Sequence, residues 1–233
     1  MKIKGITDLV ILVQEAYRSN QYAFFDDGDF NLNFFGVRQL ATWDNAFSDT
    51  LGCVLKMGGE WRVYLWQGTV DPGAYYIHEQ LGNPRGTAKV VAGQYRRLWT
   101  FGMHRNAYRA LVQIPESPVK VYRLGLEDGG VPNENTKTQS GYFGINLHRA
   151  NASGSSSPRV DRWSAGCQVF ASNATFQEAL WLAKQQVDIR GWNTFTYTLF
   201  TARDEPKGPV NPELAELLNW TPGLERYAYA TCS

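Results

Sequence analysis

The chain is poor in the residues from which covalent and metal frameworks are built. Its 233 residues include three cysteines and three histidines. The cysteines are odd in number and too widely spaced for a disulfide framework or a zinc ribbon, which favours a reducing compartment; they are Cys53, Cys167 and Cys232. The histidines lack metal-ligand spacing, and they are His78, His104 and His148. We therefore expect neither a metal nor another cofactor.

An excess of charge and long apolar runs are also missing. The 23 Lys and Arg residues nearly balance the 22 Asp and Glu residues, for a net charge of +1. This balance argues against a basic surface for nucleic acid and gives no strong attraction to an anionic polymer. No stretch approaches the ~20 apolar residues of a membrane span. The start of the chain has only a short apolar run, Leu9–Val13, so we expect neither a signal peptide nor stable membrane insertion.

What the sequence does contain suits a compact β-rich domain. Hydrophobic residues make up 43% and charged residues 19%, and the 22 glycines and 10 prolines indicate many turns. Aromatic residues reach 14%, which fits either carbohydrate-facing platforms or a large β core. The absence of a repeat or a long linker predicts one domain.

Hydrophobic periodicity and turn residues predict a mainly β fold with a few helices (α+β). Strands are expected at residues 35–39, 49–56, 60–67, 86–95, 99–103, 108–113, 119–124 and 192–201. Helices are expected at 7–20, at 174–187 with Asn173 as its cap, and at 212–219. Residues 1–34 would form an N-terminal helix and connector, 35–200 the core, and 201–233 a C-terminal extension. Segments 127–139 and 152–158 read as exposed loops.

The stretch from residue 141 to residue 170 carries the candidate chemistry. His148 follows an alternating apolar run, and Cys167 ends the sequence Ser164-Ala165-Gly166-Cys167. Two adjacent strands joined by a long connection would bring this imidazole beside the thiol. A free thiol with a pKa of roughly 8.5 is mostly protonated at neutral pH. A neighbouring imidazole can take its proton or stabilise the thiolate, which favours nucleophilic catalysis.

Neighbouring residues would complete an acyl-transfer site. The backbone N–H groups of Gly166 and Cys167 are candidates for an oxyanion hole, and the carbonyl of Arg149 is a candidate acceptor for the second nitrogen of His148. Structural alternatives exist for each: Cys167 as a small buried hydrophobe, His148 as a satisfied core histidine, and Ser164 as a brace for the turn. The loop 152–158 is either a plain connection or a flap.

These residues resemble a known family. His148 followed, about fifteen positions later, by Ser164-x-Gly-Cys resembles the signature of the L,D-transpeptidases (YkuD-type catalytic domain). A phage and prophage, endolysin-like branch of that superfamily looks closer still, on segments 144–150, 163–170, 69–76 and 104–113. The resemblance covers roughly residues 35 to 200. Two positions depart from the family pattern, because Ala165 replaces its histidine and Val169 its polar residue.

The resemblance implies a β-sandwich of the L,D-transpeptidase type with an N-terminal helix. It also implies a peptidoglycan-degrading enzyme in which Cys167, activated by His148, attacks peptide stems; the two departures favour hydrolysis over transpeptidation. Its partner would be bacterial peptidoglycan, and it would act as a monomer from the host cytoplasm by a signal-independent route. Two roles are open for His104: a core or surface residue, or a replacement for the missing motif histidine that reaches in from another strand. The expected substrate-binding residues are His104, Asp71, Tyr75, Trp163 and Glu79.

Two other functions fit the same sequence. A muramidase would need a protonated carboxylic acid near the glycosidic oxygen, and candidates are Glu60, Glu79 and Asp71. Asp71 also fits a turn cap in Asp71-Pro72-Gly73. A wall-binding or virion structural module that keeps a decayed site is the non-enzymatic alternative.

Overall fold

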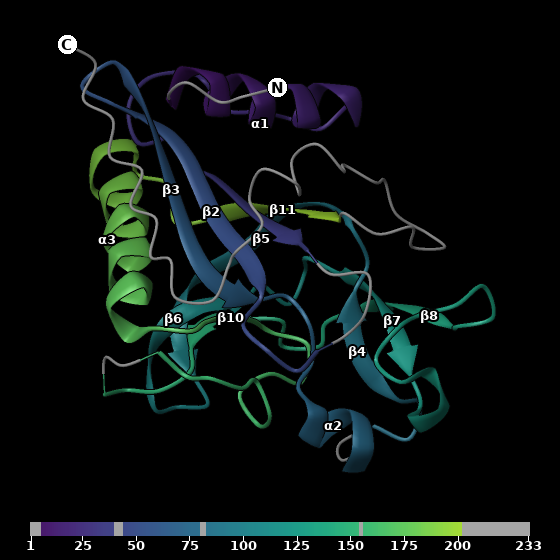
Figure 1. The fold of residues 1–233 in the computed structure, drawn as a ribbon. Helices are drawn as coiled ribbons and strands as arrows, with labels where there is room; N and C mark the ends of the chain where they lie inside the picture. The colour runs from purple at the N-terminus through teal and green to yellow at the C-terminus, as the bar shows by residue number, and fades with distance from the viewer. Residues whose placement is uncertain (1–5, 40–43, 80–82, 154–155, 202–233) are drawn as a thin grey trace.

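The computed structural model describes residues 6–39, 44–79, 83–153 and 156–201, which form a mainly β fold with three α-helices (Figure 1). This agrees with the predicted class, including the helix at the N-terminus. Of the predicted C-terminal extension, only Thr201 is described, and it ends a strand. The predicted helix 212–219 and Cys232 lie outside the described residues, as do two residues of the loop 152–158. No helix in the described ranges is both long and apolar enough to cross a membrane.

The larger sheet has eight strands in the order β1-β11-β5-β6-β9-β10-β3-β2, and β2 pairs with β1, so the sheet closes on itself. Its pairs β1–β11 and β9–β10 are parallel and the others antiparallel. The strands are β1 (Asn33–Arg38), β2 (Asp49–Met57), β3 (Glu60–Thr69), β5 (Gly93–His104), β6 (Tyr108–Gln113), β9 (Leu147–Arg149), β10 (Gln168–Phe170) and β11 (Phe195–Thr201). Cys53 of β2 is fully buried.

A second sheet of three strands stands to one side, with β4 (Thr87–Val90), β7 (Val119–Leu124) and β8 (Thr138–Gly141) in that order (Figure 1). The predicted strand 86–95 is wrong, because the chain changes sheets between β4 and β5. The predicted break before residue 99 is also wrong. Arg97 adopts a left-handed φ of 51°, and the β5–β11 register shifts nearby, so the strand bulges and continues.

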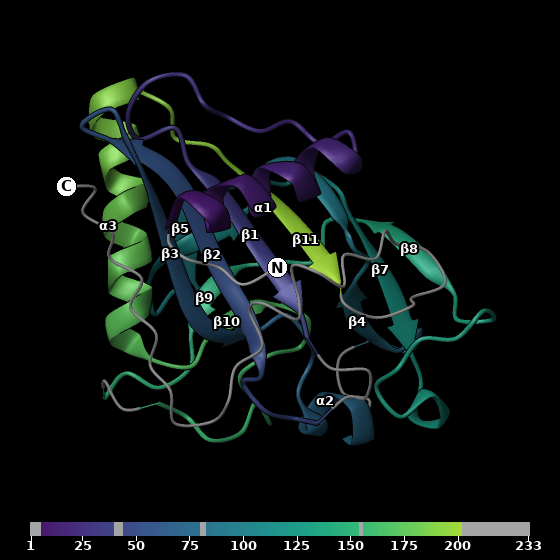
Figure 2. The same ribbon diagram turned by 45° about the horizontal axis from the view of Figure 1, so that its top comes forward.

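Helix α1 (Ile6–Ser19) covers one face of the large sheet and crosses β1, β2 and β11 (Figure 2). Its buried side chains pack on the outward side chains of these strands, and the cluster includes Leu9, Val13, Tyr17, Phe35, Val54 and Phe200. The apolar residues recur at helical spacing, which is why the sequence predicted this helix.

Helix α3 (Asn173–Arg190) follows β10 and buries its apolar side in the main core, where it joins residues from most strands of the large sheet. Its cap is Ser172 and not the predicted Asn173, because the Ser172 hydroxyl accepts a hydrogen bond of 3.2 Å from the Ala174 N–H. Gly191 ends the helix at a φ of 72°. Three short elements were not predicted: α2 (Ala74–Glu79), a 3₁₀ turn (Leu126–Asp128) and β8.

Candidate functional site

Strands β9 and β10 bring the predicted histidine and cysteine to one side of the sheet. The two strands pair in parallel, with His148 opposite Val169. Paired residues share a face and alternate residues along a strand return to it, so Cys167, two positions before Val169, faces the same side as His148. The prediction of two adjacent strands holds for His148, which lies in β9, whereas Cys167 directly precedes β10 and lies outside the strand.

The carbonyl of Arg149 orients the ring of His148, as the sequence predicted. Nδ1 of His148 lies 2.8 Å from this oxygen. A carbonyl can only accept, so Nδ1 carries the proton and Nε2 is the unprotonated nitrogen. Nε2 is buried and has no hydrogen-bond partner in the described part of the chain. Nε2 is therefore the nitrogen of His148 that can act as a proton acceptor, because Nδ1 already carries a proton.

Tyr108, in β6, contacts both the Arg149 carbonyl and the ring of His148. Its hydroxyl donates to the Arg149 carbonyl at 3.2 Å and lies 3.2 Å from Nδ1 of His148. The guanidinium of Arg149 lies 4.1 Å from the centroid of the Tyr108 ring. Tyr108 was missed by sequence reasoning, because no local pattern indicates that β6 pairs with β9.

His104, at the end of β5, stacks on His148. The ring centroids are 3.9 Å apart, with 22° between the ring planes. Asn146 fixes the second ring: its Oδ1 accepts from the Gln113 N–H at 2.9 Å, so its Nδ2 donates to Nδ1 of His104 at 3.1 Å. The structure thus brings together two of the three histidines, as the hypothesis for His104 required.

Burial keeps both rings uncharged. It lowers the pKa of His148 to about 3 and, with the neighbouring Arg105 and Arg149 cations, lowers the pKa of His104 to about 4. The charge of each protonated ring would also oppose protonation of its stacked partner. At neutral pH the site therefore holds two neutral imidazoles.

The thiol of Cys167 is half-buried and protonated at rest. It donates to the Gly144 carbonyl at 3.3 Å and accepts from the Asn146 N–H, which lies 3.5 Å from the sulfur. Burial raises the pKa of the Cys167 thiol, and the Asn146 N–H and Arg105 counteract only part of this rise. The resting pair is therefore a neutral thiol and a neutral imidazole.

The turn before the cysteine is braced by Ser164, which is fully buried. Its hydroxyl accepts from the Gly166 N–H at 3.1 Å and donates to the Cys167 carbonyl at 2.9 Å. The expectation that the Gly166 N–H belongs to an oxyanion hole is therefore wrong, because this group is already bonded. The N–H of Cys167 forms no hydrogen bond with any residue that the structure describes, and it remains a candidate donor.

Gly166 is required by both its backbone angle and its surroundings. Its φ is 121°, a region that favours glycine. A Cβ atom there would lie 2.5 Å from the carbonyl oxygen of Ala88 in β4. The small sheet therefore packs closely against the turn that precedes Cys167.

Asp71, predicted to contact substrate, is buried and bonded to two cations. Its Oδ1 lies 2.6 Å from Nε of Arg38, and its Oδ2 lies 2.9 Å from Nζ of Lys89. Its side chain is only 7% exposed. This placement is that of a buried structural ion network rather than of a substrate contact.

The remaining predicted substrate contacts lie around α2 and the turn before Cys167. Tyr75 belongs to α2, and the guanidinium of Arg162 lies 4.1 Å from its ring centroid. Glu79 is exposed at the end of the same helix, and Trp163, next to Ser164, is 42% exposed. In the described ranges, these three side chains form no hydrogen bond with Cys167 or His148.

The carboxylates proposed for glycan cleavage do not converge in the described structure. Glu60 begins β3 and pairs with Arg62, whereas the other end of β3 pairs with β10. Nine residues of strand separate these ends by about 30 Å. In the ranges that the structure describes, no three His, Cys, Asp or Glu side chains group in a way that could hold a metal ion.

Comparison of the chain with models of protein families, with curated proteins and with solved structures finds no match.

Proposed function

We propose that this chain is a cysteine hydrolase that acts on the peptide stems of peptidoglycan, on a fold related to that of the L,D-transpeptidases. The observation that carries the chemistry is the neutral Nε2 of His148, which is buried, unprotonated and on the same face as Cys167. The substrate class rests on the resemblance of the histidine and Ser-x-Gly-Cys segments to that family.

The mechanism begins with the thiol leaving the Gly144 carbonyl. Its proton passes to Nε2 of His148 as the sulfur attacks the scissile carbonyl carbon, and the charge that develops on the carbonyl oxygen is stabilised by the N–H of Cys167. The tetrahedral intermediate collapses, the C–N bond breaks, and the leaving amine takes the proton from Nε2. A thioester to Cys167 remains.

Water completes the hydrolysis. His148 takes a proton from the water that attacks the thioester, and the thiolate regains a proton when it leaves. The carbonyl of Arg149 stabilises the imidazolium formed in each half-reaction, because it accepts a hydrogen bond from the Nδ1–H group of His148 throughout. The stacked His104 is neutral, so it opposes this imidazolium less than a charged neighbour would.

The test is mass spectrometry of the fragments released from purified peptidoglycan. We expect the wild-type chain to release stem peptides with new carboxyl ends, and Cys167→Ala to release none while keeping its circular dichroism spectrum. Cys232→Ser, which removes a cysteine near the C-terminus, is the matched control and should retain activity. Release of new reducing sugars, or undiminished activity of Cys167→Ala, would refute the proposal.

A further inference from the structure

Three arginines border the candidate site without an acidic partner among the described residues: Arg105, Arg149 and Arg162. The ion pairs of the described chain lie elsewhere. Arg149 and Arg162 lie over tyrosine rings, and Nη2 of Arg105 donates to the Tyr76 hydroxyl at 3.3 Å. A guanidinium group without a carboxylate partner is available to bind an anion.

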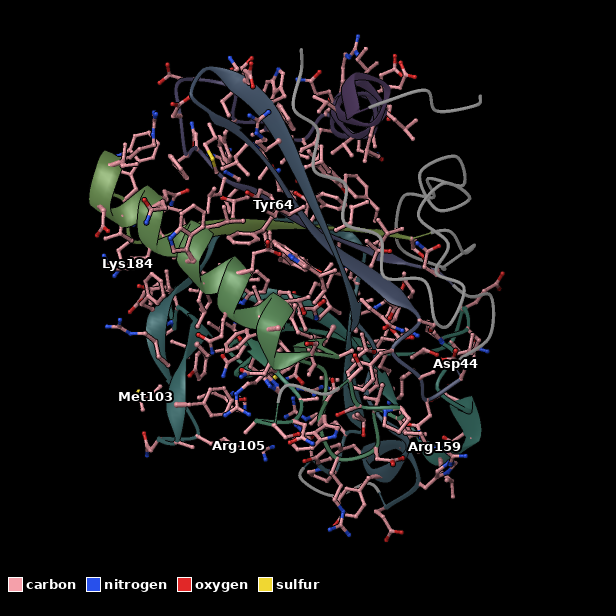
Figure 3. The ribbon with its side chains drawn as sticks, turned by 60° about the vertical axis from the view of Figure 1, so that its left-hand side comes forward. Asp44, Tyr64, Met103, Arg105, Arg159 and Lys184 are labelled. Carbon is pink, nitrogen blue, oxygen red and sulfur yellow. The ribbon has the colours of Figure 1, made fainter. Side chains whose placement is uncertain are left out.

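Arg105 is the one of the three whose charge lowers the pKa of the Cys167 thiol, whereas both Arg105 and Arg149 lower the pKa of the two histidines. A thiolate at Cys167 would raise the pKa of Arg105, and Arg105 in turn lowers the pKa of His104 and of His148. The residue follows His104 directly, so its backbone is fixed beside the stacked rings. Figure 3 shows Arg105 near Met103 at the turn end of the β5–β6 hairpin, beyond the lower end of α3.

The backbone at this turn is unfavourable for arginine. Arg105 and Asn106 adopt left-handed φ values of 50° and 56°, and the Ala107 N–H donates to the His104 carbonyl at 2.9 Å. Asparagine and glycine suit such positions, whereas a long side chain there costs about 1 kcal/mol. The turn alone therefore gives no reason for arginine at residue 105.

We propose that Arg105, held by the Tyr76 hydroxyl, binds a free carboxylate of the substrate close to the carbonyl that Cys167 attacks. The guanidinium fork suits a carboxylate, which it can bind through two parallel hydrogen bonds. The inference rests on the proposed function, and it narrows the substrate to stems with a free carboxyl group beside the scissile bond. Arg105 is thus a specificity-determining residue.

The test measures binding apart from turnover. A stem tetrapeptide with a free terminal carboxylate and the same peptide as a carboxamide are titrated calorimetrically into the Cys167→Ala protein. We expect the free acid to bind about 10- to 100-fold more tightly than the amide, the range for a charge-assisted pair. Adding Arg105→Gln should abolish this preference, and Arg105→Lys should restore part of it.

The matched control is Arg109→Gln. Arg109 is an exposed arginine of the same hairpin, and it lies over the Phe101 ring. This variant should keep the full preference for the acid. In turnover by the protein with Cys167 intact, Arg105→Gln should raise KM for the acid, and Arg109→Gln should not.

Equal binding of acid and amide, no measurable binding of the acid, or an unchanged preference in Arg105→Gln would overturn this inference. None of these results bears on whether Cys167 cleaves peptidoglycan. Conversely, full activity of Cys167→Ala would refute only the proposed cysteine hydrolysis. A preference for the acid that depends on Arg105 would still support the proposed role of Arg105 in binding a carboxylate.

Discussion

His104 and His148 lie face to face, with ring centroids 3.9 Å apart, although 44 positions separate them in the chain. Each ring has a fixed tautomer, because the Arg149 carbonyl holds Nδ1 of His148 and the Asn146 amide holds Nδ1 of His104. Protonating either ring places a cation against the other and beside Arg105 and Arg149. The stack is therefore most stable when both rings are neutral.

This stack predicts a loss of stability in mild acid. The pKa values of about 4 and about 3 lie below the ordinary value of 6.5, so between pH 6.5 and 4 the unfolded chain binds protons that the folded chain does not. The free energy of unfolding therefore falls as the pH drops from 7 to 4.5, by a few kcal/mol. Urea unfolding at several pH values measures it.

His104→Phe is the control for the acid sensitivity. The phenyl ring keeps a flat stacking partner and does not titrate, so the variant should lose less stability over the same pH range than the wild-type chain does. An identical pH dependence in the two proteins would assign the effect to other groups.

Tyr108→Phe should reduce turnover more than stability. The change removes the hydroxyl that contacts both Nδ1 of His148 and the Arg149 carbonyl, so the imidazole is less firmly oriented. We expect kcat to fall about 10-fold and the free energy of unfolding by about 1 kcal/mol. Steady-state kinetics and denaturant unfolding measure the two effects.

Tyr95→Phe is its matched control. The Tyr95 hydroxyl also contacts two backbone carbonyls, those of Val91 and Lys120, but it lies away from the two histidines. This variant should lose similar stability and keep its kcat. Equal losses of kcat in both variants would remove the positioning role of Tyr108.

Cys167 should react slowly with iodoacetamide at neutral pH. Burial raises the pKa of Cys167, so the thiolate fraction is small at neutral pH. The labelling rate should therefore climb steadily from pH 6 to 10 without reaching a plateau at the acidic end of this range. Labelling of Cys232→Ser followed by peptide mapping isolates Cys167, because Cys53 is fully buried. Fast labelling at pH 6 would indicate a preformed thiolate and contradict the neutral pair.

Asp71→Asn should destabilise the fold strongly. It removes the charge that lies between the fully buried side chains of Arg38 and Lys89, and an uncompensated buried charge costs about 3–5 kcal/mol. Asp27→Asn is the matched control, because Asp27 is 88% exposed in its pair with Arg190 and should matter by less than about 1 kcal/mol. Thermal unfolding of both variants tests the difference, and equal melting temperatures would disprove it.

The sequence predicted the elements whose evidence is local. Alternation of apolar and polar residues located β2 and β3, and helical spacing located α1 and α3. It also predicted that His148 and Cys167 would lie on adjoining segments with the Arg149 carbonyl as the acceptor, because both predictions depend on residues within one 30-residue stretch.

What the sequence did not reveal depends on partners distant in the chain. The same alternation runs through β4 and β5, and nothing in it tells which sheet each strand joins. Asp71 has the local pattern of a turn residue, whereas its burial follows from Arg38 and Lys89 in other strands. Tyr108 and Asn146 enter the site only because β5, β6 and β9 are neighbours in the large sheet.

The close approach of Gly166 to the Ala88 carbonyl couples the position of Cys167 to the small sheet. A Cβ atom at residue 166 would lie 2.5 Å from that oxygen, so β4 leaves no room there for a side chain. A larger residue at position 166, or a shift of β4 at Ala88, should therefore displace the sulfur of Cys167.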